Sequence, residues 1–149
     1  MSTLTEPTLS DLLAILDEVW GSFLSSPEPL LPASDDGMNH GTSAAVTITG
    51  DWRGIVVVET SRPVAEEVTR RMLMLDAVTP DDVADAMGEL VNIVGGQVKS
   101  LTGGQSTLSL PIVASGHLVQ PSEARELCRA DLVWIGEPVR VTVLSVRTP

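Results

Sequence analysis

Residues 81–104, DDVADAMGELVNIVGGQVKSLTGG, restrict the fold of this chain more than any other stretch. Apolar side chains recur there every three or four positions, which at about 100° per residue places them on one side of an α-helix. They are Val83, Met87, Leu90, Val94, Val98 and Leu101, with Val91 and Ile93 at the edges. Thr79 is a suitable N-cap, Pro80 a suitable first residue and Gly103-Gly104 a suitable end. We therefore predict a long helix whose apolar side lies in the core.

The opposite side of that helix carries an unusual strip, roughly 60° wide, formed by Asp85, Glu89, Asn92 and Gly96. Gly88 and Gly95 flank the strip, although each glycine inside a helix costs about 0.5–1 kcal/mol relative to alanine. One interpretation is a catalytic or docking surface, where bare backbone lets another molecule come close to a carboxylate and a carboxamide. The other is an ordinary solvated face whose glycines serve close helix packing.

The residue types in the strip limit its chemistry. Asp85 and Glu89 are two carboxylates at i and i+4 without a histidine partner, so no metal-binding set is evident. His40 and His117 are far from them in sequence and are interpreted as loop residues, which gives no support to a serine or cysteine nucleophile with a histidine base. The Asn92 carboxamide offers an acceptor and two donors. It can therefore hold a water in line with a phosphorus atom, and phosphoryl transfer depends mainly on such positioning.

Composition and charge exclude several other classes of protein. The 149 residues, 43% of them hydrophobic, suit one folded domain. A formal charge of −11 and a pI near 4.4 disfavour nucleic acid and anionic membrane surfaces. The single cysteine, Cys128, excludes an intramolecular disulfide, and we interpret it as a small core residue in helical surroundings rather than a reactive thiol. No apolar run approaches the roughly 20 residues that span a bilayer, and the start of the chain does not resemble a signal peptide, so we expect a cytoplasmic protein.

The first half of the chain reads as a helix, a long loop, a hairpin and a second helix. Thr8 or Ser10 can cap a helix that ends near Ser25, followed by a proline-rich loop up to residue 42. Residues 43–49 and 53–60 predict a hairpin, rich in Val, Ile and Thr, around Gly50-Asp51. Ser61 can cap a second helix that ends around Leu75.

The second half predicts strands after the central helix. Residues 105–113 form one strand with Pro111 at an edge or bulge, residues 115–120 a turn or short strand, and residues 121–128 a brief helical turn. Two last strands cover 130–135 and 139–146. We interpret Trp20 and Trp134 as core residues, and Trp52 as core in preference to an exposed contact. We expect a flexible segment 1–8 and a single α+β domain 9–149, with the first and central helices side by side.

The motif Asp85-x-x-x-Glu89-x-x-Asn92-x-x-Gly95 resembles the signature of the CheC–CheX–FliY family of chemotaxis phosphatases. The segment Leu108-Ser109-Leu110-Pro111-Ile112-Val113 is similar to the strand that follows the signature helix in that family, and the likeness covers the chain from about Leu9 onward. The first helix has Glu18, but Gly21 and Ala14 stand where a second site would need an asparagine and an acid. The chain therefore looks like the single-site CheX branch.

The resemblance implies a CheX/CheC-like fold, with long helices packed on one face of a mainly antiparallel β-sheet. It also implies an aspartyl-phosphate phosphatase that acts on a phosphorylated CheY-like response regulator and forms a homodimer. In that reading Asn92 aligns the attacking water, Glu89 pairs with the regulator's active-site lysine, and Asp85 orients the strip or contacts the partner. Gly88, Gly95 and Gly96 leave room for the partner's loops. No cofactor is expected in this chain, because Mg²⁺ belongs to the regulator.

Two alternatives stay open at this point. One is a catalytically silent binding module that recognises a response regulator or a flagellar-switch protein through the same face. The other is a purely structural dimerisation domain, for which neither Glu89 nor Asn92 matters.

Overall fold

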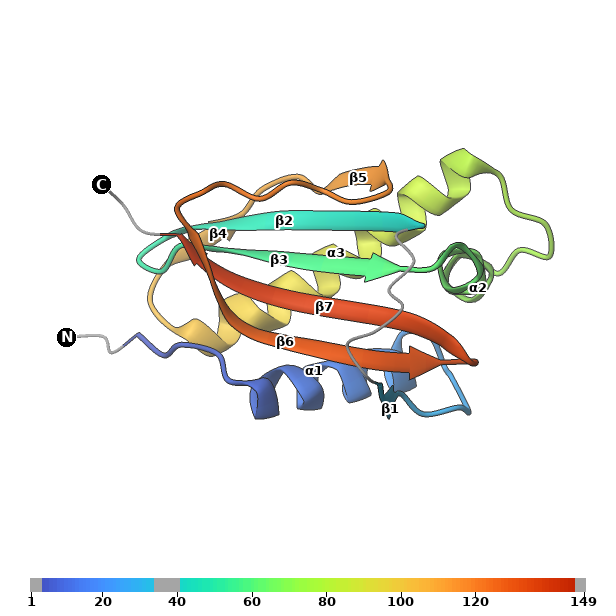
Figure 1. Cartoon of the computed structure of the whole chain (residues 1–149), viewed down its shortest axis with the longest axis horizontal. Coiled ribbons are helices and arrows are strands. Elements are labelled where there is room, and N and C mark those ends of the chain that lie inside the picture. Colours follow the sequence, from blue (N-terminus) through green and yellow to red (C-terminus); the bar gives the residue numbers. More distant parts are fainter. Residues whose placement is uncertain (1–3, 34–40, 147–149) are drawn as a thin grey trace.

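A seven-stranded sheet forms one layer of the protein in its computed structural model, which describes residues 4–33 and 41–146. The strands follow the order β1 (Leu31–Pro32), β6 (Ala124–Trp134), β7 (Glu137–Val146), β3 (Gly54–Thr60), β2 (Thr42–Gly50) and β4 (Ser106–Leu108), and β5 (Ile112–Ser115) also pairs with β2. All of these pairings are antiparallel. Helices α1 (Leu9–Ser22) and α3 (Pro80–Thr102) lie behind the sheet in the view of Figure 1, while α2 (Arg62–Leu73) lies at one end of it. This confirms the predicted α+β class with helices on one face of an antiparallel sheet.

The helices begin at the predicted caps. They are α1 (Leu9–Ser22), α2 (Arg62–Leu73) and α3 (Pro80–Thr102). At the start of α3 the Asp82 N–H donates to Thr79 Oγ1 at 3.2 Å, and the Thr79 N–H donates to Asp82 Oδ2 at 2.9 Å. This reciprocal capping box satisfies backbone donors that the first helical turn leaves free. It therefore fixes where α3 begins.

The core lies between the sheet and the two long helices. Val56 and Val58 of the sheet and Leu90 and Val94 of α3 are all fully buried. The three tryptophans are buried as predicted, and the rings of Trp20 and Trp134 meet edge to face with their centroids 5.9 Å apart. Helical periodicity predicts one apolar side for the first helix, formed by Leu9, Leu12, Leu13, Leu16, Val19, Trp20 and Phe23. This is wrong for Leu9, Leu13 and Phe23, which are exposed.

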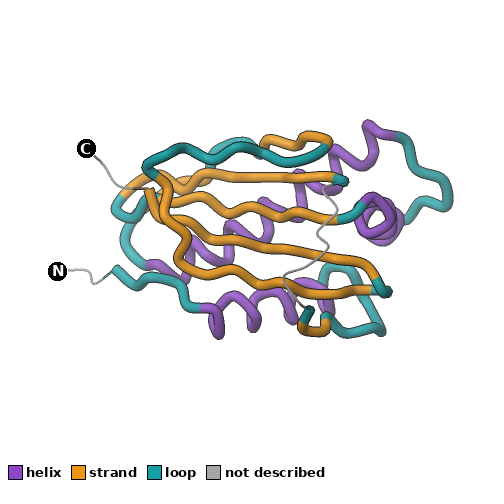
Figure 2. The backbone as a smooth tube through the Cα atoms, viewed as in Figure 1, coloured by secondary structure: helices purple, strands orange, loops and turns teal. Residues whose placement is uncertain are grey.

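The hairpin is confirmed as β2 (Thr42–Gly50) and β3 (Gly54–Thr60), which pair from Thr42↔Thr60 to Ile48↔Gly54. The remaining strands are β1 (Leu31–Pro32), β4 (Ser106–Leu108), β5 (Ile112–Ser115), β6 (Ala124–Trp134) and β7 (Glu137–Val146). After β5 the chain runs back along the sheet before it enters β6 (Figure 2).

Two predictions for the second half are wrong. The single strand 105–113 is interrupted at 109–111, so that β4 and β5 pair separately with β2. Pro111 lacks a backbone N–H and falls in this break, which agrees with its predicted place at an edge. The helical turn at 121–128 does not form, because residues from Ala124 onward pair with β7. Cys128 is nevertheless buried, as predicted, but on a strand.

Segments expected to be irregular make defined contacts. In segment 4–8, the Thr5 N–H donates to the Thr102 carbonyl at 2.9 Å. In the proline-rich loop, Ser26 Oγ accepts a 2.9 Å hydrogen bond from the Trp134 indole, and β1 pairs with β6. His40 lies outside the described residues. Among the described residues, no helix is long and apolar enough to span a membrane.

Candidate functional site

The outward side of α3 carries a polar ridge, which we define as Asp85, Glu89 and Asn92. The first two side chains are exposed and Asn92 is half-buried. The opposite side of the helix holds Met87, Leu90 and Val94, which are fully buried against the sheet. Since the back of α3 is fixed by the core, the ridge projects from a rigid support at the surface. The strip predicted from the helical spacing therefore faces solvent.

The side chains of the ridge have no partner within the described part of the chain. No hydrogen bond or ion pair joins Asp85, Glu89 or Asn92 to another side chain or backbone group there. Other acids of the helices are engaged: Asp82 caps α3, and Glu67 accepts from Arg71 Nε at 2.9 Å. An asparagine in a helix interior has poor helix propensity and no capping task. The ridge thus offers carboxylates and a carboxamide to an external group.

A shallow open depression lies beside the ridge. Its walls are formed by Ala84, Asp85, Gly88, Glu89, Asn92, Pro111 and Val113. Pro111 lies in the break between β4 and β5, and Val113 lies in β5. The wall opposite α3 therefore belongs to the edge of the sheet. The depression therefore brings the ridge and the segment after the signature helix into one site.

Pro111, Val113 and Ala84 also line the site, although the helical pattern does not point to them. For Pro111 and Val113 the signal in the sequence is indirect, because segment 108–113 reads only as a strand that follows the helix. A helical wheel shows which residues of one helix share a face, but it does not show which strand edge lies beside that face. The position of Pro111 against Gly88 is a tertiary contact.

The glycines around the ridge divide into two groups. Gly88 lines the depression, and a Cβ there would lie 3.3 Å from Pro111 Cγ. Gly95 does not line it: it is buried, and a Cβ there would lie 2.6 Å from Val46 Cγ2. The expectation that Gly95 leaves room for a partner is therefore wrong, since it makes room for this chain's own β2. At Gly96 the nearest atom, Leu108 Cδ1, is 4.0 Å away, so that side of α3 is open.

Other residues with reactive side chains lie in different surroundings. Burial raises the pKa of the Cys128 thiol above its ordinary value, and the Asp11 and Glu126 carboxylates raise it further. A thiol held in its protonated form is a poor nucleophile. His117 lies in a loop, with Nδ1 3.3 Å from Glu59 Oε2. In residues 4–33 and 41–146 no group of three or more His, Cys, Asp or Glu side chains is placed to hold a metal ion.

Comparison with known protein families identifies the class. The model of the family described as "Chemotaxis phosphatase CheX" matches residues 42–129, which include the hairpin, α3 and the sheet edge beside it. The chain belongs to this family.

Solved structures share the fold. CheX from Desulfovibrio desulfuricans is 21% identical, with a TM-score of 0.74 over 91% of this chain and 97% of that one. CheX from Vibrio vulnificus is also 21% identical, with a TM-score of 0.73 over 91% of this chain and 94% of that one. A complex of CheX, CheY, BeF₃ and Mg²⁺ from Borrelia burgdorferi also matches, at 17% identity and a TM-score of 0.71. The match covers 95% of this chain and 99% of that one. None of the curated proteins compared with the chain matches it.

Proposed function

We propose that this protein hydrolyses the aspartyl phosphate of a CheY-like response regulator. The observation that carries the proposal is the unpaired polar ridge of Asp85, Glu89 and Asn92 on a helix whose back is fixed in the core. Family membership supports phosphatase chemistry. The Borrelia CheX was solved with CheY and BeF₃, a group that stands in for the phosphoryl group, which supports the choice of partner.

In the proposed mechanism Asn92 enters the regulator's phosphorylation site and orients a water. The water oxygen attacks phosphorus, the bond between phosphorus and the aspartyl oxygen breaks, and the products are inorganic phosphate, a free aspartate carboxylate and a proton. An acyl phosphate is already a reactive mixed anhydride, so orientation of the water lowers the barrier without a covalent step on this chain. Mg²⁺ bound to the regulator would neutralise charge on the phosphoryl oxygens.

Glu89 is proposed to anchor the partner. It lies three residues before Asn92 on α3, which places the two Cα atoms about 60° apart around the axis and about 4.5 Å apart along it. A lysine in the regulator's active site would form an ion pair with the Glu89 carboxylate and set the approach of Asn92. Asp85, one further turn away, is proposed to contact the partner, and Gly88 and Gly96 to leave room for it.

The test measures phosphate release from phosphorylated CheY-like regulators encoded in the same genome. We expect Asn92→Ala to lose the acceleration, by roughly 100-fold or more, while its affinity for the beryllofluoride form of the regulator stays within about threefold. Glu89→Ala should weaken that affinity by about tenfold, the loss of one modest ion pair. Gln97→Ala is the matched control, because Gln97 is an exposed amide on α3 outside the ridge.

Two outcomes would contradict the proposal. If Asn92→Ala accelerates hydrolysis as well as the wild type does, Asn92 does not orient the water. If the wild type binds the regulator through Glu89 and Asn92 without any acceleration, the chain is the silent binding module. We also propose a homodimer, which light scattering of the purified protein would test; a monomeric mass at micromolar concentration would be evidence against it.

A further inference from the structure

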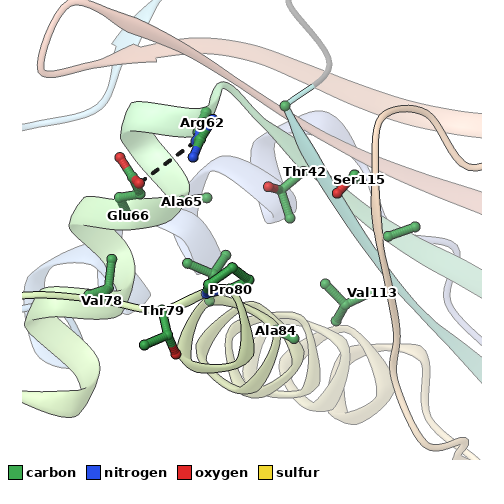
Figure 3. Close-up of a pocket in the computed structure, with 13 residues that line it drawn as sticks. Thr42, Arg62, Ala65, Glu66, Val78, Thr79, Pro80, Ala84, Val113 and Ser115 are labelled. Atoms are coloured by element: carbon green, nitrogen blue, oxygen red, sulfur yellow. Dashed lines mark ion pairs between the residues drawn. The ribbon is translucent and has the colours of Figure 1, made fainter.

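A second hollow lies next to the depression and is larger. We define the side pocket as the cavity of about 520 Å³ between α2, the start of α3 and the end of β5; its lining includes Ala65, Val78, Val83, Val113 and Ser115. Figure 3 shows α2 with Arg62 and Glu66 on one side of it, and Val113 and Ser115 of the sheet edge on the other. Its volume is within the range of about 300–1,000 Å³ found for ligand pockets.

The side pocket and the depression are neighbours that share two wall residues, Ala84 and Val113. The two hollows therefore lie along consecutive stretches of α3, 80–84 and 84–92, with β5 as a common wall. A molecule that places a reactive group over Asn92 extends across the side pocket if it continues toward the N-terminal end of α3. The two hollows form one continuous surface.

The lining of the side pocket suits an apolar side chain. Apolar side chains form slightly more than half of the wall: they belong to Ala65, Val78, Pro80, Val83, Ala84, Val113 and Ala114. Five polar residues complete the wall, and three of them have partners: Thr79 Oγ1 accepts from the Asp82 N–H, and Arg62 Nε lies 3.8 Å from Glu66 Oε2. The other two are Thr42 and Ser115. A small polar ligand needs several convergent polar groups, and three of the five polar residues here are already held in a helix cap or an ion pair.

We propose that the side pocket receives an apolar side chain of the same phosphorylated regulator whose acyl phosphate meets the polar ridge. This inference rests on the proposed function and adds to it a determinant of partner choice that lies outside the chemical site. Burial of one such side chain should tighten binding without altering the orientation of water by Asn92. The pocket should therefore act on KM and leave kcat unchanged.

Ser115→Trp is the decisive variant. Ser115 is exposed, and it lines the side pocket without lining the depression, so an indole there fills the pocket while the ridge remains open. Thr107→Trp is the matched control: Thr107 is an exposed residue of β4 at the same sheet edge and lines neither hollow. Ser115→Leu repeats the measurement with a smaller insertion if the tryptophan variant has a lowered unfolding midpoint.

The measurements are KM and kcat for the phosphorylated regulator, and affinity for its beryllofluoride form. We expect Ser115→Trp to raise KM and Kd by about 10- to 100-fold, as loss of one buried apolar side chain would, with kcat within about twofold of the wild type. Thr107→Trp should leave all three constants unchanged. If Ser115→Trp leaves KM unchanged while the wild type is active, the inference is overturned and the proposed function stays intact. The side pocket would then have a different occupant, such as a small molecule or a second copy of the chain. A wild type that neither binds nor dephosphorylates the regulators would overturn both.

Discussion

Gly95 of α3 lies directly against Val46 of β2, so closely that a Cβ on the glycine would be 2.6 Å from Val46 Cγ2. Real Cβ atoms essentially never come this close to another atom. The contact therefore sets the distance between α3 and the sheet. Gly95 flanks the ridge on the same helix, about 60° from Asn92 around the axis. This packing therefore determines how far Glu89 and Asn92 stand out from the surface.

Gly95→Ala should destabilise the protein relative to Gly96→Ala. Both variants gain the helix propensity of alanine, but only Gly95→Ala forces a shift of Val46, because the nearest atom to a Cβ at Gly96 is 4.0 Å away. Overpacking of this kind costs about 1–3 kcal/mol, which is the expected difference between the two variants. Urea unfolding followed by tryptophan fluorescence measures this difference in the free energy of unfolding. Equal urea midpoints for the two variants would mean that α3 can move away from β2 at no cost.

Ser26→Ala should lower the free energy of unfolding by about 1–3 kcal/mol. The Trp134 side chain is fully buried, and its indole N–H donates to Ser26 Oγ at 2.9 Å. Removal of the hydroxyl leaves that donor buried without an acceptor. Ser22→Ala is the control, because Ser22 is exposed at the end of α1. If both variants unfold at the same urea concentration, this hydrogen bond does not stabilise the fold.

The stability of the protein should fall above pH 9 because of Cys128. Burial, with Asp11 and Glu126 as further causes, raises the pKa of this thiol in the folded state above its ordinary 9.0. As the pH rises through that ordinary value, the thiol of the unfolded chain loses its proton before the thiol of the folded chain does. The contribution of Cys128 to the free energy of unfolding is fully present at lower pH and is lost over this range. Few other groups titrate there, since the chain has no tyrosine and Lys99 is its one lysine.

The urea midpoint of the wild type should therefore fall more between pH 8 and pH 10 than that of Cys128→Ala. The comparison is made within each variant across pH, so the packing cost of the substitution cancels. If the urea midpoints of the two proteins fall by the same amount between pH 8 and pH 10, a group other than Cys128 causes the loss of stability at alkaline pH.

Leu110→Ser should weaken binding of the regulator without changing stability. Leu110 is 87% exposed and directly precedes Pro111, which walls the depression beside Asn92. A large apolar side chain at the rim of a polar site is suited to contact with a partner. We expect an increase in KM of about tenfold and an unchanged unfolding midpoint.

Val119→Ser provides the comparison for that experiment. Val119 is 89% exposed but lines neither the depression nor the side pocket. The same increase in KM for both variants would indicate a general effect of surface hydrophobicity rather than a contact made by Leu110.

The sequence predicted those elements whose own residues decide their form. The start of α3 follows from Thr79, Pro80 and Asp82, and the buried and exposed sides of the helix follow from its periodicity. The prediction was wrong for residues 121–128, where Ala124, Arg125 and Glu126 have good helix propensity. Pairing with β7 overrides that local preference, which no pattern within the segment reveals.

The same distinction applies to the site. The ridge was predicted because its three residues belong to one helix. The opposing wall of Pro111 and Val113 depends on which strand edge lies beside α3, and the role of Gly95 depends on Val46, a residue 49 positions earlier in the chain. Contacts between distant segments set these features, so a single sequence read by periodicity does not contain them.

The break at residues 109–111 also limits how this sheet edge can pair with another chain. A sheet edge with a continuous row of free N–H and C=O groups invites an extra strand from another molecule. Here Pro111 offers no N–H, and β4 and β5 are too short and too discontinuous to template such an addition. The sheet edge beside the ridge therefore offers an added strand no continuous row of donors and acceptors.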